Sequence, residues 1–311
     1  MADGKKYKNS IPVELSDCTL CPRECHVNRS AGEIGYCGQT AVLTAARAAL
    51  HFWEEPCLSG TNGSGAVFFS GCNLRCVYCQ NREIAQGFSG LEISISRLSD
   101  IFLELQEKDA HNINLITPSH FVPQIITALE TAKKQGLSIP VIYNTSAYEK
   151  TDTLKMLDGL IDIYLPDLKY QDANLSERYS HAPDYFDTAV RAIDEMVRQA
   201  GTPVFTNDAD PLMKKGVIVR HLLLPGCEND TRRILRFLHE TYKNDIYVSI
   251  MNQYTPLPQV KGIPELNRKI TSREYEKIVD FAISIGIENG FIQEGETALE
   301  SFIPSFDNEG I

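Results

Sequence analysis

The sequence predicts an α/β protein, a parallel partial (β/α)6 barrel preceded by a cysteine-rich N-terminal segment. Short apolar runs typical of strands buried on both faces recur from residue 66 to residue 251, and helical apolar patterns separate them. Connections of this length force the strands to pair in parallel. We expect a cysteine-rich metal-binding segment at 1–62, the barrel at 63–294 and a C-terminal tail at 295–311.

Six apolar runs are the expected strands, and they lie at 66–70, 113–117, 141–145, 161–167, 217–224 and 246–251. Apolar side chains with helical spacing predict helices over 98–105, 122–129 and 275–285. The last of these should begin after Thr271 or Ser272 as its cap and end at Gly286. The glycine-rich stretch at 60–65 precedes a strand and opens no helix, so it is expected to be a linker and not a dinucleotide-binding loop.

Composition limits the classes of partner. The chain has 311 residues, 43% of them hydrophobic, and 41 acidic against 30 basic residues give a net charge of -11. No concentrated basic stretch is present to bind a phosphate backbone, so we expect no nucleic acid partner. Residues 1–10 are polar and no apolar run approaches membrane-spanning length, which predicts a cytoplasmic protein without a membrane partner.

The nine cysteines are an odd number, and seven of them form two groups, which makes a disulfide framework a poor interpretation. Cys72, Cys76 and Cys79 share one loop after the first expected barrel strand, with the spacing Cys-x3-Cys-x2-Cys. Three thiolates can bind three irons of a [4Fe-4S] cluster and leave the fourth iron open to a small chelating ligand such as S-adenosylmethionine (AdoMet). A structural zinc ion would need a fourth ligand.

With this loop the sequence resembles the radical SAM superfamily, and over 18–306 it is most similar to the PflX-like branch, related to the activating enzymes of pyruvate formate-lyase. The motifs that carry the resemblance are Cys-Thr-Leu-Cys-Pro-Arg-Glu-Cys at 18–25, His-Phe-Trp-Glu-Glu-Pro-Cys at 51–57, Phe-Ser-Gly-Cys at 69–72, Tyr-Leu-Pro-Asp-Leu-Lys at 164–169 and Asn-Gly-Phe-Ile-Gln-Glu at 289–294. The resemblance implies an oxidoreductase that cleaves AdoMet to methionine and a 5'-deoxyadenosyl radical, which abstracts hydrogen from a substrate. It also implies a reducing electron donor such as flavodoxin or ferredoxin. Two versions of the substrate stay open, a glycyl-radical protein that the enzyme activates, or a different peptide or small molecule that it modifies.

The resemblance also implies contacts with AdoMet. Tyr78, just before the third cysteine of the loop, corresponds to an aromatic residue near the adenine, although a core tyrosine explains it equally well. Asp167 and Lys169 match the activases' Asp-Leu-Lys signature, in which the acid binds ribose or amino hydrogens and the lysine meets the AdoMet carboxylate. Arg220 resembles an arginine that clamps a carboxylate, with a buried salt bridge as the alternative. Where activases place a histidine on the sixth strand, Asn-Gln-Tyr stands at 252–254.

The chain departs from the family pattern after its second expected strand. Radical SAM proteins commonly have Gly-Gly-Glu there to hold the AdoMet amino group, but this chain has Thr-Pro-Ser-His at 117–120. Thr117 and Ser119 are the remaining oxygen acceptors. After the third strand, Asn144 and Ser146 are either ribose contacts or turn residues.

Four cysteines precede the barrel and form a second candidate metal site, namely Cys18, Cys21, Cys25 and Cys37. Four thiolates complete the coordination of a structural zinc ion or of a second [4Fe-4S] cluster, and both alternatives remain open. Cys57 is an alternative ligand, although a small apolar filler is the favoured interpretation.

One alternative function belongs to a different class. A non-catalytic iron-sulfur or zinc protein would use the barrel only as a binding platform, and the missing Gly-Gly-Glu is the feature that favours it. The sequence contains no nucleophile elbow, Walker loop or His-Glu-x-x-His pattern, so no motif indicates a hydrolase or a P-loop enzyme.

Overall fold

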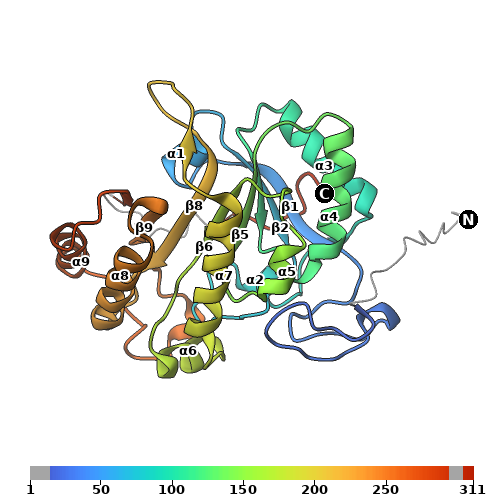
Figure 1. The fold of residues 1–311 in the computed structure, drawn as a ribbon. Helices are drawn as coiled ribbons and strands as arrows, with labels where there is room; N and C mark the ends of the chain where they lie inside the picture. The colour runs from blue at the N-terminus through green and yellow to red at the C-terminus, as the bar shows by residue number, and fades with distance from the viewer. Residues whose placement is uncertain (1–14, 294–303) are drawn as a thin grey trace, which may run out of the picture.

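A computed structural model describes residues 15–293 and 304–311. These residues form one large sheet with helices packed around its outside (Figure 1). Along the sheet the strands follow the order β10-β9-β8-β6-β5-β4-β2-β1-β3. Each parallel strand therefore lies beside its neighbour in the sequence, as in the predicted partial barrel.

All six predicted strands are present and pair in parallel. They are β2 (Ser64–Phe69), β4 (Ile113–Ile116), β5 (Val141–Thr145), β6 (Ile163–Pro166), β8 (Met213–Leu222) and β9 (Tyr247–Met251). A seventh parallel strand, β10 (Gly290–Ile292), adds to β9. The prediction missed β10 because three residues are too short a run to show a strand pattern.

Helices follow the strands, and the three predicted ones are confirmed as α3 (Ile95–Glu107), α4 (Val122–Lys134) and α9 (Ser272–Ser284). The cap of α9 is Thr271, which forms a reciprocal capping box with Glu274. The other helices are α1 (Pro56–Ser59), α2 (Arg82–Ala85), α5 (Thr151–Lys155), α6 (Ala173–Ser180), α7 (Tyr185–Ala200) and α8 (Glu228–Tyr242), with 3-10 turns at Arg29–Ala31, Ser119–Phe121, Lys243–Asp245 and Pro258–Val260. No helix among the described residues is both long and apolar enough to cross a membrane.

The sheet also recruits residues from outside the expected barrel. Residues 44–51, which we expected inside the cysteine-rich N-terminal segment, form β1 (Thr44–His51), antiparallel to β2. The sequence analysis did not predict this strand because it is rich in alanine, a residue that is depleted in strands. Two short strands, β3 (Leu91–Glu92) and β7 (Val204–Phe205), pair with β1 and β8.

The chain end covers the part of the β1 edge that β3 leaves open (Figure 1). Ala48 donates its backbone N–H to the carbonyl of Glu309 at 2.8 Å, and Asn308 donates to the carbonyl of Ala46 at 3.1 Å. This pairing protects backbone groups that an open sheet edge would expose. The polar residues 1–10, Glu294 at the expected end of the barrel, and residues 295–303 of the expected tail lie outside the described residues.

Alternate residues of each strand face the helices or the interior of the curved sheet. Leu115, Tyr143 and Val219 belong to the core that packs under the helices. The interior face carries a separate apolar cluster, and α1 packs against it through Cys57 and Leu58. Cys57 therefore packs as an apolar side chain in this cluster, in agreement with the favoured interpretation of the sequence.

The carboxyl group of Glu149 is buried inside the protein. Glu149 follows β5, is 1% exposed and accepts hydrogen bonds from the hydroxyls of Ser119 and Thr145. Burial raises its pKa to about 7, although the hydroxyls favour the ionised form and limit the rise.

We predict that Glu149 makes the protein less stable as the pH rises. The folded state holds the proton more tightly than an unfolded glutamate does, so stability is lost between about pH 4.5 and about pH 7, by up to about 3 kcal/mol. Glu149→Gln should remove this loss. Urea unfolding of both proteins at about pH 5 and about pH 8 tests it, and parallel pH dependences would contradict the prediction.

Candidate functional site

The loop that carries three cysteines leaves β2 through Gly71, whose φ of +90° suits glycine. Cys72, Cys76 and Cys79 are all half-buried. Burial raises the pKa of the Cys79 thiol to about 12, and the neighbouring Cys76 and Cys72 sulfurs add to the rise. The three sulfurs therefore lie within electrostatic range of one another, on one short loop.

The chemistry of this donor set fits an iron-sulfur cluster. Neighbouring buried thiolates repel one another, so they stay deprotonated only beside positive charge. The iron ions of a cluster supply that charge. In such a cluster each cysteine binds a different iron. Among the described residues, no three His, Cys, Asp or Glu side chains are arranged to share a single metal ion.

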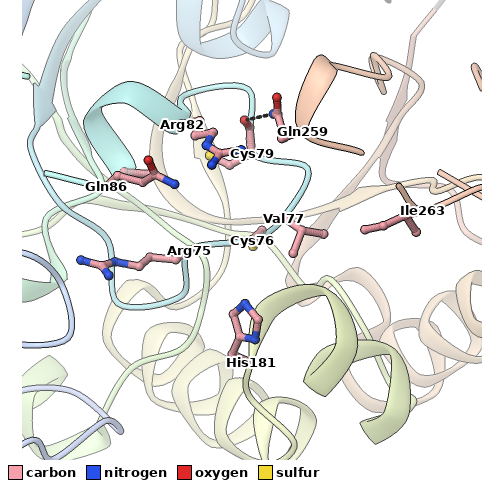
Figure 2. Close-up of a pocket in the computed structure, with 10 residues that line it drawn as sticks. Arg75, Cys76, Val77, Cys79, Arg82, Gln86, His181, Gln259 and Ile263 are labelled. Carbon is pink, nitrogen blue, oxygen red and sulfur yellow. Dashed lines mark hydrogen bonds between the residues drawn. The ribbon is translucent and has the colours of Figure 1, made fainter. Parts of the chain in front are cut away.

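A cavity of about 260 Å³ opens beside two of these thiols (Figure 2). Its lining includes Cys76 and Cys79 together with Arg75, Arg82 and His181. The two arginines beside the thiols favour an anionic thiolate-bound cluster. Gln259, also in the lining, donates its side-chain amide to the carbonyl of Cys79 at 3.2 Å, and this bond is drawn in Figure 2.

Three of the residues predicted to bind AdoMet form one network on the interior face of the sheet. Arg220 in β8 donates from Nε to Asp167 at 2.8 Å and from Nη2 to Asn144 at 2.7 Å. Its third donor group, Nη1, contacts Glu54 at 3.0 Å. Arg220 thus forms a buried salt bridge with Glu54 and Asp167, and its role toward AdoMet stays a prediction.

Lys169 extends this network toward the cysteine loop. Its Nζ lies 2.7 Å from Asp167 Oδ2 and close enough to the Cys76 thiol to oppose the rise in pKa that burial causes there. Burial raises the pKa of Asp167 as well, but Arg220 and Lys169 overcome that effect and hold it below its ordinary value. Asp167 is therefore a carboxylate between two cations.

Glu54 and Glu55 were not among the predicted site residues. Both are buried in the segment between β1 and α1, and burial raises the pKa of each carboxyl, with Arg220 opposing the rise. Glu54 Oε1 accepts from Asn114 at 2.9 Å, in addition to the contact with Arg220. Their adjacency in a motif at 51–57 was the available signal, but no local pattern shows that a loop enters the interior of a sheet.

The other predicted contacts lie around the ends of the strands. The Tyr78 hydroxyl accepts from Tyr170 at 2.7 Å in the core, and Thr117 is half-buried. The Ser119 hydroxyl donates to Glu149. Ser146 is 7% exposed, and its buried hydroxyl has no hydrogen-bond partner, which leaves it available to a ligand. The roles of all four toward AdoMet stay predictions.

The four N-terminal cysteines come together in one small cluster. A Cβ at Gly35 would lie 3.3 Å from the Cys25 sulfur and 3.4 Å from the Cys37 sulfur, so glycine leaves open the space between them. Burial raises the pKa of Cys21 to about 12, and both Cys37 and Cys18 add to it.

Arg29 brings a buried positive charge to these thiols. It is 1% exposed, and its Nη1 lies 3.8 Å from the Cys18 sulfur. Its Nη1 also donates to the carbonyl of His120 at 2.8 Å, and its Nη2 to that of Thr40 at 2.7 Å. The guanidinium lowers the pKa of Cys37 against the effect of burial.

We predict that Arg220 is needed for folding. Arg220→Met leaves Glu54 and Asp167 as buried acids without their main partner, which should lower the free energy of unfolding by about 3 to 5 kcal/mol. Denaturant unfolding measures this loss, with Arg198→Met as the control, because Arg198 is an exposed partner of Glu195 and Asp158 and should matter little. Equal stabilities of the two variants would contradict the prediction.

Known proteins resemble this chain in sequence and in fold. The uncharacterized protein MJ0674 of Methanocaldococcus jannaschii is 29% identical over 274 residues, which are 86% of this chain and 75% of that protein. The FeFe-hydrogenase maturase HydG from Carboxydothermus hydrogenoformans aligns with a TM-score of 0.52 and 12% identity, over 76% of this chain and 56% of that one. A second HydG crystal structure aligns at 0.50 and 16% identity, over 76% and 54%. This chain thus spans about half the length of the maturases, and the likeness concerns the fold.

The family comparison covers the loop itself. The model of the radical SAM superfamily matches residues 66–238, more than half of the chain, from β2 through the cysteine loop and into α8. This family implies a [4Fe-4S] cluster and AdoMet as cofactors. With the cysteine loop at the end of β2 and a parallel sheet around it, the chain belongs to the radical SAM superfamily.

Proposed function

We propose that this protein reductively cleaves AdoMet and uses the resulting 5'-deoxyadenosyl radical to abstract hydrogen from a substrate. The observation that carries the proposal is the loop of three neighbouring thiols, with the Lys169 ammonium beside Cys76, in a chain of the radical SAM superfamily. The cluster, when bound, would supply the electron that breaks the carbon-sulfur bond of AdoMet.

In this proposal each group of the chain has a separate task. Cys72, Cys76 and Cys79 hold the cluster. Lys169 takes the AdoMet carboxylate, because its present partner Asp167 also has Arg220 to bind and can share the lysine. The unpartnered hydroxyl of Ser146 is an oxygen available to the ribose or the amino group.

The finer parts of the function remain proposals too. The resemblance to the PflX-like branch supports a protein or peptide substrate, with activation of a glycyl-radical protein as one version, and flavodoxin or ferredoxin as the reductant. A net charge of -11 and the absence of a basic run favour such partners over nucleic acid. We propose a cytoplasmic location, where a reducing environment keeps the thiols free for iron.

The cysteine loop provides the direct test. Changing Cys72, Cys76 and Cys79 together to alanine should abolish formation of 5'-deoxyadenosine from AdoMet after anaerobic reconstitution and reduction, because the iron loses its protein ligands. The control is Cys227→Ala, since Cys227 lies at the start of α8 and packs on the main core. Undiminished product from the triple variant would contradict the assignment. An intact cluster in the wild type without any product would favour the non-catalytic alternative.

We further propose that Cys18, Cys21, Cys25 and Cys37 hold a second metal centre, either zinc or a [4Fe-4S] cluster. The nearness of the four thiols, the open space at Gly35 and the buried Arg29 support it. Because no three of these thiols are arranged to share a single ion, the arrangement favours the cluster over zinc. Four thiolates carry a large negative charge, and a nearby guanidinium stabilises a metal centre that remains anionic.

Metal analysis distinguishes the two metals at this second site. If both sites hold clusters, the reconstituted wild type should contain about eight irons and the triple loop variant about four, by four irons per cluster. If the N-terminal site holds zinc, the wild type should contain about four irons and about one zinc. A fully reconstituted wild type with only about four irons and no zinc would show that these cysteines bind no metal.

A further inference from the structure

Arg23 joins the N-terminal cysteine turn to the loop of the radical site. It stands between Cys21 and Cys25 in the sequence. Its Nε donates to the carbonyl of Asn73 at 2.8 Å, its Nη2 donates to the carbonyl of Ser180 at 3.1 Å, and its Nη1 donates to the carbonyl of His181. One guanidinium therefore holds carbonyls from the cysteine loop and from the end of α6.

Aromatic rings hold the same guanidinium in place. Its carbon lies 4.1 Å from the centre of the Tyr36 ring and 5.1 Å from that of Tyr148. The Arg75 guanidinium of the cysteine loop lies 5.2 Å from the same Tyr36 ring. Arginine suits this position because its planar fork donates several hydrogen bonds while its face stacks on rings, which the lysine ammonium cannot do.

The carbonyls that Arg23 holds belong to residues next to the sulfur ligands. Asn73 follows Cys72 directly, and its side-chain amide is fixed on the carbonyl of Tyr148 at 2.7 Å. The Ser180 hydroxyl donates to the Cys76 sulfur at 3.0 Å. Arg23 thus acts on the position of one ligand and on the hydrogen bond to another.

The backbone of the loop also rests directly on the N-terminal segment. Cys72 donates its backbone N–H to the carbonyl of Cys37 at 3.2 Å. A Cβ at Gly71 would lie only 2.6 Å from that carbonyl oxygen, so the two segments leave no room for a side chain there. Residues 71–80 contain no helix or strand, so contacts of this kind determine the shape of the loop.

We propose that Arg23 is a positioning residue for the radical site: it sets the spacing of Cys72 and Cys76 and the hydrogen bond to the Cys76 sulfur. The proposal rests on the proposed function of the cysteine loop. Hydrogen bonds to cluster sulfurs tune the reduction potential and ligand geometry, so the N-terminal segment becomes part of the radical site.

The test compares Arg23→Ala and Arg23→Lys with the wild type, each as the full chain reconstituted anaerobically. The electron paramagnetic resonance spectrum of the reduced cluster is recorded with and without AdoMet, and the rate of 5'-deoxyadenosine formation is measured. Both variants should show altered spectra and a weaker change on AdoMet addition. The rate should fall about tenfold to a hundredfold, because a misplaced ligand misaligns the reacting groups. Lysine should not rescue the rate.

Two further variants keep the result interpretable. Lys150→Ala removes an ion pair with Glu24, the neighbour of Arg23, and should match the wild type in spectrum and rate. If Arg23→Ala does not fold, Tyr36→Leu removes the ring beneath the guanidinium and should shift the spectrum in the same direction by less.

Wild-type spectra and rates in both Arg23 variants would overturn the proposal, even if their melting temperatures fall, because they would show a role in stability alone. That outcome leaves the proposed function intact. If instead the wild type forms no 5'-deoxyadenosine, the proposed function fails, while the spectra still report whether Arg23 positions the cluster.

Discussion

The buried Arg220 guanidinium is the interaction on which the interior of this protein depends. It joins β8 to the end of β6 through Asp167, to β5 through Asn144, and to the loop after β1 through Glu54. A guanidinium cannot lose its charge at physiological pH, so burying it requires acceptors on every side. The need for these acceptors fixes four segments relative to one another.

This constraint reaches the proposed active site through a single carboxylate. Asp167 binds Arg220 with one oxygen and Lys169 with the other. The lysine ammonium is thereby held near the Cys76 thiol, on the side of the sheet where the cysteine loop emerges. The network therefore links a buried salt bridge to the lysine that we propose binds the AdoMet carboxylate. If a ligand carboxylate takes Lys169, Asp167 stays paired with Arg220.

The cysteine loop is held from the opposite direction by the N-terminal segment. Gly71 and Cys72 pack on the Cys37 carbonyl, and the Arg23 guanidinium takes the Asn73 carbonyl. The loop thus lies between the sheet and a segment that carries four further cysteines. If those cysteines bind a metal, its binding energy contributes to the folding of this segment and so to the shape of the loop.

Features that depend on local pattern could be predicted from the amino-acid sequence. Six strands, three helices, and the loop of Cys72, Cys76 and Cys79 at the end of the first barrel strand all follow from apolar periodicity and cysteine spacing. They could be predicted because neighbouring residues share a face of an element or a turn of a loop. The strand at 44–51 was missed because its alanines carry a weak pattern, and its identity depends on pairing with β2.

Contacts between residues far apart in the sequence became visible only in the folded protein. The protein partners of Arg220 could not be predicted from its own motif, because Glu54 lies 166 positions away in the sequence. The contact of Arg23 with Ser180, across 157 positions, was equally invisible. Long-range pairs of this kind form when the folding of the chain brings distant strands and loops together. A periodic pattern in the sequence describes one element at a time and does not show which elements meet.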